Sequence, residues 1–290
     1  MSFRIILLAK QVPDTRNVGK DAMKEDGTIN RAALPAIFNP EDLNALEMAL
    51  KIKDTIKGAT INIVTMGPTR AAEIVREAMY RGADAGVVVS DRKVAGSDTL
   101  ATSYTISQAI KKFGGYDVVI AGRQAIDGDT AQVGPQSAEK LGVPQITYAE
   151  EIMAVDEKKI QIKRRLERGI EVVESSFPCL ITVNNSAAEC RSRHAKRVMA
   201  FKKAASATEA IEKNIDLSTL WQKNPNLKIE EWNAADINAD DSRLGLTGSP
   251  TKVKKIDNVV LTQKENKQLE PTDTDIDSLM KELISSHIIG

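Results

Sequence analysis

Apolar and polar residues follow two alternating patterns along the first half of the chain. Short apolar runs, which are typical of buried strands, alternate with stretches whose apolar residues recur every three or four positions, as in a helix. The predicted strands are residues 3–9, 60–65, 85–90, 117–121 and 145–148. The predicted helices are residues 40–53, 69–81, 98–112 and 136–142. This alternation predicts an α/β fold with a mostly parallel sheet and helices on both faces.

The pattern changes near residue 150. Short strand-like segments with turn residues between them predict a small antiparallel β segment within residues 150–183. These segments are residues 152–155, 159–165 and 170–174. One more strand is predicted at residues 178–183, at the end of this region.

The last third of the chain is polar and mixed, with clusters of Asn and Asp near residues 233–241. This composition indicates a C-terminal arm rather than further sheet, with a last helix at residues 275–286. We therefore divide the chain into an α/β domain, residues 1–204, and an arm, residues 205–290.

A glycine-rich loop joins the predicted strand at residues 117–121 to the following helix. Residues 122–134, here called the cradle loop, contain three glycines and two aspartates. Backbone N–H groups at a helix start lack helical partners and attract anions, and the helix dipole adds to this attraction. The loop therefore predicts a cradle for a nucleotide phosphate, although it matches neither common glycine-rich phosphate motif. A tight surface turn is the alternative interpretation.

Other loops are expected at the same edge of the sheet. Ligands of open parallel sheets lie beyond the carboxyl ends of the strands. The loops after Ala9, Thr65 and Ala121 all follow predicted strands, so we expect them to converge on one ligand. Residues 39–42 lie near this edge too, but their local sequence indicates ordinary helix capping. Met66 fits packing better than chemistry.

Composition narrows the classes of function. Lys+Arg and Asp+Glu both number 40, and this balance argues against the basic field of a nucleic-acid-binding protein. Two cysteines and two histidines leave little for a disulfide framework, a metal site or a catalytic triad. No apolar run reaches the roughly 18 residues that a membrane span needs. We expect a soluble, cytoplasmic protein without a catalytic side chain or a bound metal.

Three charged features allow more than one interpretation. Asp127 and Asp129 fit paired acid–base carboxylates, but at such a loop they fit helix capping or ribose binding better. The basic run at residues 191–203 lacks interleaved aromatics, which argues against base stacking. It predicts a solvated face or a docking segment for an acidic partner. Cys190 lies beside basic residues that favour its thiolate.

A second pattern matches a family signature. It reads as a basic residue, an acidic residue with glycine, a glutamate and then proline with aliphatic residues. Its members are Arg164, Glu167, Gly169, Glu171, Pro178, Leu180, Ile181 and Thr182. Arg168 departs from the signature, which usually has glycine or an acid there. With further matches from residues 10–15 to residues 246–251, the chain resembles the β subunit of electron transfer flavoproteins.

The resemblance implies a Rossmann-like, adenine-nucleotide-binding α/β domain that pairs with a larger α subunit carrying a flavin. It also implies that residues 183–205 form a partner-docking loop and that the arm wraps the partner subunit. The usual large apolar anchor of that loop is missing at residues 194–196. The implied cofactor-binding residues are Ala9, Asn39, Pro40, Glu41, Asp42, Met66, Gly122, Arg123, Gln124, Ala125, Ile126, Asp127, Gly128, Asp129, Thr130, Ala131, Gln132 and Val133.

The cofactor is open between FAD and AMP. Gly128 and Thr130, together with residues 96–102 and 245–251, resemble electron-bifurcating members. The resemblance then implies FAD that accepts electrons from NADH. One electron passes to ferredoxin or flavodoxin, and the other passes through the α-subunit FAD to a dehydrogenase of the acyl-CoA dehydrogenase type. Arg123 is a candidate for stabilising an anionic flavin.

Two alternatives to bifurcation are kept. The first is an electron relay with structural AMP in the same site. The second is a non-redox protein that binds an adenine nucleotide. The cofactors that remain bound after purification distinguish these three hypotheses.

Overall fold

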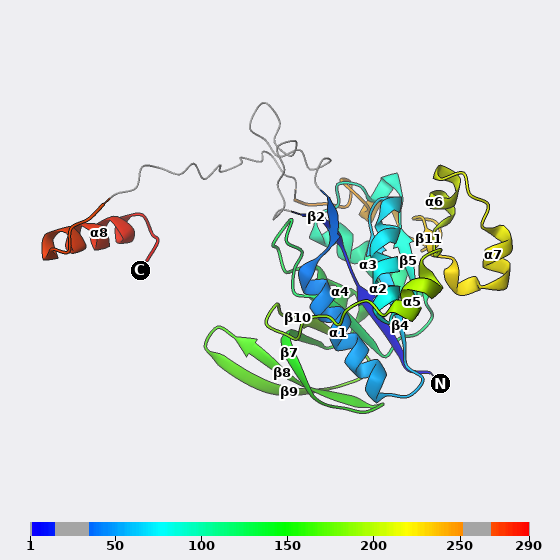
Figure 1. Cartoon of the computed structure of the whole chain (residues 1–290), viewed down its shortest axis with the longest axis horizontal. Coiled ribbons are helices and arrows are strands. Elements are labelled where there is room, and N and C mark those ends of the chain that lie inside the picture. The colour runs from blue at the N-terminus through cyan, green and yellow to red at the C-terminus, as the bar shows by residue number, and fades with distance from the viewer. Residues whose placement is uncertain (1, 15–34, 252–267, 290) are drawn as a thin grey trace.

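The main sheet contains nine strands, and helices cover both of its faces (Figure 1). The computed structural model describes residues 2–14, 35–251 and 268–289. In chain order the strands are β1 (Arg4–Leu8), β4 (Thr60–Met66), β5 (Ala85–Val89), β6 (Val118–Gly122), β7 (Gln145–Val155), β8 (Lys159–Leu166), β9 (Gly169–Ser176), β10 (Cys179–Val183) and β11 (Glu230–Trp232). Their order across the sheet is β11-β5-β4-β1-β6-β10-β7-β8-β9. All neighbours from β11 to β7 are parallel, whereas β8 and β9 pair antiparallel.

The helices lie on both faces of this sheet, which confirms the predicted fold class. Within the described residues they are α1 (Pro40–Thr55), α2 (Ala72–Arg81), α3 (Thr99–Lys112), α4 (Val133–Leu141), α5 (Ala195–Phe201), α6 (Ala207–Glu212), α7 (Ser218–Lys223) and α8 (Asp273–Ser285). Short 3-10 turns are η2 (Thr69–Ala71), η3 (Arg92–Val94), η4 (Pro225–Leu227) and η5 (Asp241–Arg243). Helices α1 and α2 pack on one face, and α3 and α4 pack on the other.

Strand β1 shows why the apolar runs are continuous. Successive side chains of a strand point to opposite faces of the sheet. Ile5 and Leu7 pack in the cluster with α1 and α2, whereas Ile6 and Leu8 pack with α3 and α4. Because both faces are buried from Ile5 to Leu8, all four of these positions are apolar, whereas Arg4 at the start of the strand is exposed.

Strand β7 differs from its prediction. Residues 145–148 and 152–155 were expected to be separate strands, but they belong to one strand of 11 residues. Its first half pairs parallel with β10 and its second half antiparallel with β8. The register shifts between Ala149 and Glu151 and again between Ile152 and Ala154. Such bulges bend a strand and interrupt its alternation, so the sequence pattern indicates a break.

Part of the expected arm packs on the sheet of its own chain. Strand β11 extends the sheet by pairing parallel with β5. The Trp232 ring lies 5.0 Å from the ring of Phe113, and Ile237 and Leu244 are buried. By contrast, α8 has no buried residue and lies apart from the sheet in Figure 1. The first part of the segment therefore adds to the α/β layers, and only its last helix stands alone among the described residues.

A small hairpin was not predicted. Strands β2 (Gln11–Pro13) and β3 (Ala36–Phe38) pair antiparallel, and Asn39 follows directly before α1. The hairpin therefore brings the end of β1 and the start of α1 together.

Across the described ranges, no helix combines the length and apolar character that crossing a bilayer requires.

Candidate functional site

A cavity of about 730 Å³ opens at the carboxyl ends of β1, β4 and β6, and we call it the strand-end cavity. Ala9, Met66 and Gly122 line it from the three loops that were expected to converge. Leu8, Val64 and Ile106 make part of its wall apolar. The cavity therefore joins an apolar wall to the polar backbone of the cradle loop.

The residues that the resemblance indicated fall into two groups. Those that line the cavity are Ala9, Asp42, Met66, Gly122, Arg123, Gln124, Ala125, Gly128, Asp129, Thr130, Ala131, Gln132 and Val133. Those outside its lining are Asn39, Pro40, Glu41, Ile126 and Asp127. The second group lies in the first turn of α1 and at the outer side of the cradle loop, where it touches other parts of the site.

The first turn of α1 braces the cradle loop. The side chain of Asn39 makes no capping bond to its own helix. Instead its Nδ2 donates to the carbonyl of Gln124 at 2.8 Å, and its Oδ1 accepts from the N–H of Ile126 at 3.2 Å. Asn39 is the N-cap residue of α1, as predicted, but its side chain binds the cradle loop instead of capping the helix, because the polar backbone of that loop lies within reach.

Glu41 continues this bracing. Its carboxylate accepts from the guanidinium of Arg123 at 2.8 Å and from the N–H of Gln124 at 3.2 Å. The pair with Glu41 raises the pKa of Arg123. Arg123 lines the cavity, but its charge is partly neutralised there by Glu41.

Asp42 joins two strand ends. One of its carboxylate oxygens accepts from the N–H of Lys10 at 2.8 Å, and the other accepts from the N–H of Gly122 at 3.1 Å. Burial raises the pKa of Asp42 to about 7, although both backbone bonds favour the charged form and lower it. A side chain at Gly122 is impossible here, because a Cβ would meet the Asp42 carboxylate.

The cradle loop presents its backbone to the cavity. Asp129 and Ala131 have positive φ angles of 48° and 52°, and Gln132 then returns to the right-handed region. Alternating backbone hands of this kind turn successive N–H groups toward one side and form anion-binding concavities. Among the described residues, the N–H groups of residues 130–134 have no protein acceptor. Helix α4, which begins in this loop, has no side-chain cap.

The two cradle aspartates do not cap α4, so that interpretation is wrong. Asp127 forms an ion pair with Lys10 Nζ at 2.7 Å, across the loop that follows β1. Asp129 accepts from Gln124 Nε2 at 2.9 Å within the cradle loop. Both carboxylates therefore fix the shape of the loop and leave the donors at the start of α4 available. Ribose binding by either of them stays a prediction.

Helix α3 also begins at the cavity, but a side chain occupies two of its first N–H groups. Asp98 caps it by accepting from the N–H groups of Leu100 and Ala101 at 2.9 and 3.0 Å. The two helix starts are joined by a bond of 2.8 Å from Thr99 to Gln132. An anion in this cavity therefore finds more backbone donors without a described acceptor at the start of α4, where no side chain caps the helix, than at the start of α3, where Asp98 occupies two of them.

The basic run at residues 191–203 is held on α1 and α2. Arg191 pairs with Glu47 at 2.9 Å, and Arg193 pairs with Glu77 at 2.8 Å. The solvated-face interpretation is thus wrong for Arg191, which is partly buried, whereas Arg193 stays exposed beside its partner. Burial raises the pKa of Cys190 to about 11, which overturns the interpretation that its basic neighbours favour the thiolate.

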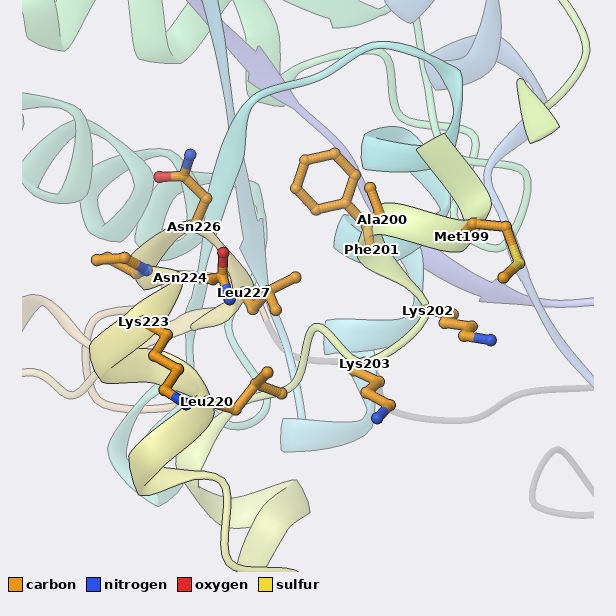
Figure 2. A pocket seen from close by; sticks show the side chains of 11 residues that line it. Met199, Ala200, Phe201, Lys202, Lys203, Leu220, Lys223, Asn224, Asn226 and Leu227 are labelled. Atoms are coloured by element: carbon orange, nitrogen blue, oxygen red, sulfur yellow. The ribbon is translucent and has the colours of Figure 1, made fainter. Parts of the chain in front are cut away.

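A second hollow, of about 710 Å³, lies between α5 on one side and α7 with η4 on the other (Figure 2). We call it the lysine groove. Lys202, Lys203 and Lys223 line it beside the apolar side chains of Phe201 and Leu220. Within the described residues these lysines form no ion pair.

Comparison with known proteins agrees with the signature in the sequence. The family model described as the electron transfer flavoprotein domain matches residues 26–213. The chain is 40% identical to the electron transfer flavoprotein subunit beta of Megasphaera elsdenii, over 98% of this chain and 99% of the relative.

The chain belongs to the electron transfer flavoprotein β-subunit family. It is 42% identical to the caffeyl-CoA reductase–Etf complex subunit CarD of Acetobacterium woodii, over 86% of both chains. It is also 51% identical to the acryloyl-CoA reductase electron transfer subunit gamma of Anaerotignum propionicum, over 62% of this chain and 66% of the relative. The family thereby accounts for both the parallel sheet and the glycine-rich loop at its edge.

Several lining residues were missed as members of the site. Lys10, Gly96, Asp98 and Thr99 come from the starts of loops or helices, and Thr251 comes from the segment expected to be an arm. The local pattern signalled Asp98 only as the start of a helix, and only the resemblance pointed to its segment. Residues 96–102 and 245–251, which the resemblance singled out, both reach this cavity.

Proposed function

We propose that the protein is the β subunit of a heterodimeric electron transfer flavoprotein and binds FAD in the strand-end cavity. In this proposal the FAD accepts electrons from NADH and bifurcates them. One electron goes to ferredoxin or flavodoxin, and the other goes through the α-subunit FAD to a partner dehydrogenase of the acyl-CoA dehydrogenase type. The cytoplasm is the proposed location.

One observation carries the proposal: residues of the cradle loop whose N–H groups have no acceptor among the described residues line a cavity with an apolar wall. The volume of about 730 Å³ lies within the usual range of sites for small organic ligands, about 300–1,000 Å³. The N–H groups of residues 130–134 suit a diphosphate, and Leu8, Val64 and Ile106 suit a flat apolar ring. An amphipathic nucleotide fits this pairing better than a bare phosphate does.

The chain contributes binding and orientation. When bound, FAD supplies the exchange of a hydride with NADH and of single electrons with other carriers. Gly128 lines the cavity, and a Cβ there would meet nothing within 4 Å, so the loop leaves open space at this point. Met66 lies at the end of β4 where its flexible thioether can pack against a ring.

The names of two relatives support the choice of partner. One belongs to a caffeyl-CoA reductase–Etf complex, and the other is an electron transfer subunit of acryloyl-CoA reductase. Both names join an electron transfer subunit to the reduction of a CoA ester. We extend this to the present chain as a proposal, with the partner bound through residues 183–205. Of the region 205–290, helix α8, which has no buried residue in this chain, would lie against the α subunit.

The alternatives place a different ligand in the same cavity. AMP would use the same backbone donors and leave more of the apolar wall uncovered, as expected for a simple electron relay. A non-redox protein would bind an adenine nucleotide without any flavin in the complex. The size of the cavity favours the larger cofactor.

The test is the cofactor content of the αβ complex after co-expression and gel filtration. Acid extraction and chromatography identify the nucleotides, and anaerobic titration with NADH shows which flavin is reduced. Two FAD per heterodimer, one of them reduced by NADH, is the expected result. One FAD with one AMP per heterodimer would contradict bifurcation and support a simple electron relay. A complex without flavin would contradict the assignment as an electron transfer flavoprotein subunit.

A further inference from the structure

One wall of the strand-end cavity comes from far along the chain. Residues 240–251, here called the strap, cross the loop between β5 and α3 and end at Thr251, which lines the cavity. The guanidinium carbon of Arg243 lies 3.9 Å from the centre of the Tyr104 ring. The N–H of Asp240 donates to the Tyr104 hydroxyl at 2.9 Å. The strap is thereby fastened to α3 at its beginning.

The other end of the strap is fastened to Asp98. One oxygen of this carboxylate accepts from the hydroxyl of Thr251 at 2.7 Å and from its N–H at 3.1 Å. The N–H of Asp98 donates to the hydroxyl of Ser249 at 2.8 Å. Burial alone would raise the pKa of Asp98, but its bonds, with Thr251 first among them, hold the pKa below its ordinary value.

The strap fits closely against the loop beneath it. Gly96 has a φ of 72°, and a Cβ there would lie 2.9 Å from the side chain of Leu246. Gly245 has a φ of 53°, and a Cβ there would collide with the carbonyl of Lys93. Both glycines are therefore required for the strap to lie flat, because larger residues would hold it away from the cavity.

The same carboxylate thus does two things. Through its first oxygen Asp98 caps α3, which is joined to the cradle loop by the bond between Thr99 and Gln132. Through its second oxygen it holds Thr251 at the opposite wall. The cradle loop, α3 and the strap are joined by a continuous chain of hydrogen bonds along the cavity, and Asp98 is the member through which the strap joins this chain.

We propose that Asp98 is a positioning residue that latches the strap over the strand-end cavity and thereby slows the release of the bound nucleotide. This inference rests on the proposed function, since it requires a nucleotide in that cavity. In this proposal Asp98 does not act on the reacting flavin ring. It determines how easily the strap moves away from the cavity at Thr251. Loss of the latch therefore raises the dissociation rate more than it changes the spectrum or reduction of the bound flavin.

The decisive comparison is Thr251→Val against Thr251→Ser in the αβ complex loaded with FAD. Valine removes the hydroxyl that donates to Asp98, whereas serine keeps it. Release of FAD is followed by flavin fluorescence after dilution into excess AMP. We expect Thr251→Val to release FAD about fivefold faster, which is the scale of one lost hydrogen bond of ordinary net strength. Thr251→Ser is expected within twofold of the wild type.

The complex is expected to hold two FAD, so its release kinetics can have two phases. The phase that comes from the strand-end cavity is the one that changes in Asn39→Ala, because this substitution loosens the cradle loop. If no phase of FAD release responds to Asn39→Ala, the proposed function fails. If a phase responds to Asn39→Ala but not to Thr251→Val, only the latch fails. Equal release from the valine and serine variants would also overturn the latch.

A second readout does not depend on flavin. Amide hydrogen exchange of residues 244–251 reports how often the strap opens. We expect faster exchange there in Thr251→Val than in the wild type. Asp156→Asn serves as the matched control, because Asp156 also accepts from two backbone N–H groups but lies in the turn between β7 and β8. Unchanged exchange of the strap in Thr251→Val would contradict the proposal.

Discussion

The strand-end cavity and the lysine groove are nearly equal in size, about 730 and 710 Å³, but they are built differently. In the strand-end cavity the cationic side chains are already paired, Lys10 with Asp127 at 2.7 Å and Arg123 with Glu41 at 2.8 Å. The donors that lack an acceptor in the described part of the chain are backbone N–H groups there. In the lysine groove (Figure 2) the charge sits on long side chains without ion pairs among the described residues.

The strand-end cavity is thus a preorganised binding site, whereas the lysine groove is a surface whose charged side chains are not held in place. Backbone donors that a brace holds in place lose little entropy when a ligand binds, whereas free lysines must be ordered first. Volume alone does not distinguish the two cavities as binding sites. The bracing from α1, with Asn39, Glu41 and Asp42 each bound to backbone at the strand ends, distinguishes them.

The largest effect is expected when the brace is removed by Asn39→Ala. This change leaves the carbonyl of Gln124 and the N–H of Ile126 without their partner. We expect a loss of about 2–3 kcal/mol in unfolding free energy, the cost of two unpaired groups. The nucleotide content after gel filtration should fall as well.

The matched control is Asn44→Ala in the same helix. Asn44 also makes two side-chain bonds, but to the carbonyls of Ala187 and Ala188, away from the cradle loop. It should cost stability without loss of nucleotide. Equal nucleotide content in the Asn39 and Asn44 variants would show that bracing does not define the site.

A smaller effect is expected from pH at Asp42. Because burial raises its folded pKa to about 7, the folded state binds more protons than the unfolded state between about pH 4 and 7. The contribution of Asp42 to stability therefore decreases as pH rises through this window, by about 2 kcal/mol between pH 5 and 7. The melting temperature of the wild type minus that of Asp42→Asn should shrink over this range. A difference that stays constant, or grows, would refute this assignment.

The smallest effect is expected in the lysine groove. Replacing Lys202, Lys203 and Lys223 together by alanine removes three exposed charges that pair with no described residue. We expect stability to change by at most about 0.5 kcal/mol per substitution, with unchanged nucleotide content. Loss of the nucleotide in this variant would show that the nucleotide binds in the lysine groove or enters through it. It would contradict the assignment of the strand-end cavity as the binding site.

The parallel sheet could be predicted because its strands are buried on both faces. Residues 117–121 form such a run, and the loop after them had to lie at the carboxyl edge with the loops of other strands. Strand β11 could not be predicted, since its residues Glu230, Glu231 and Trp232 show no strand pattern and its place depends on pairing with β5.

In the candidate site, too, the features that local sequence determines could be predicted, and those that depend on tertiary contacts could not. The glycines and helix start of the cradle loop were visible because they are local signals. The side chain of Asn39 was misassigned, since local sequence shows a helix start but not the backbone groups of a distant loop. Asp98 and Thr251 are 153 positions apart, so only the folded chain brings them together.

The most direct test of the account is a structure of the αβ complex with its nucleotide bound. The decisive quantity is the distance from the phosphate oxygens to the backbone nitrogens of residues 130–134. The account predicts at least two such distances within hydrogen-bond range, about 2.7–3.2 Å, at the start of α4. Phosphates held instead at the start of α3, in the lysine groove or outside the strand-end cavity would contradict it.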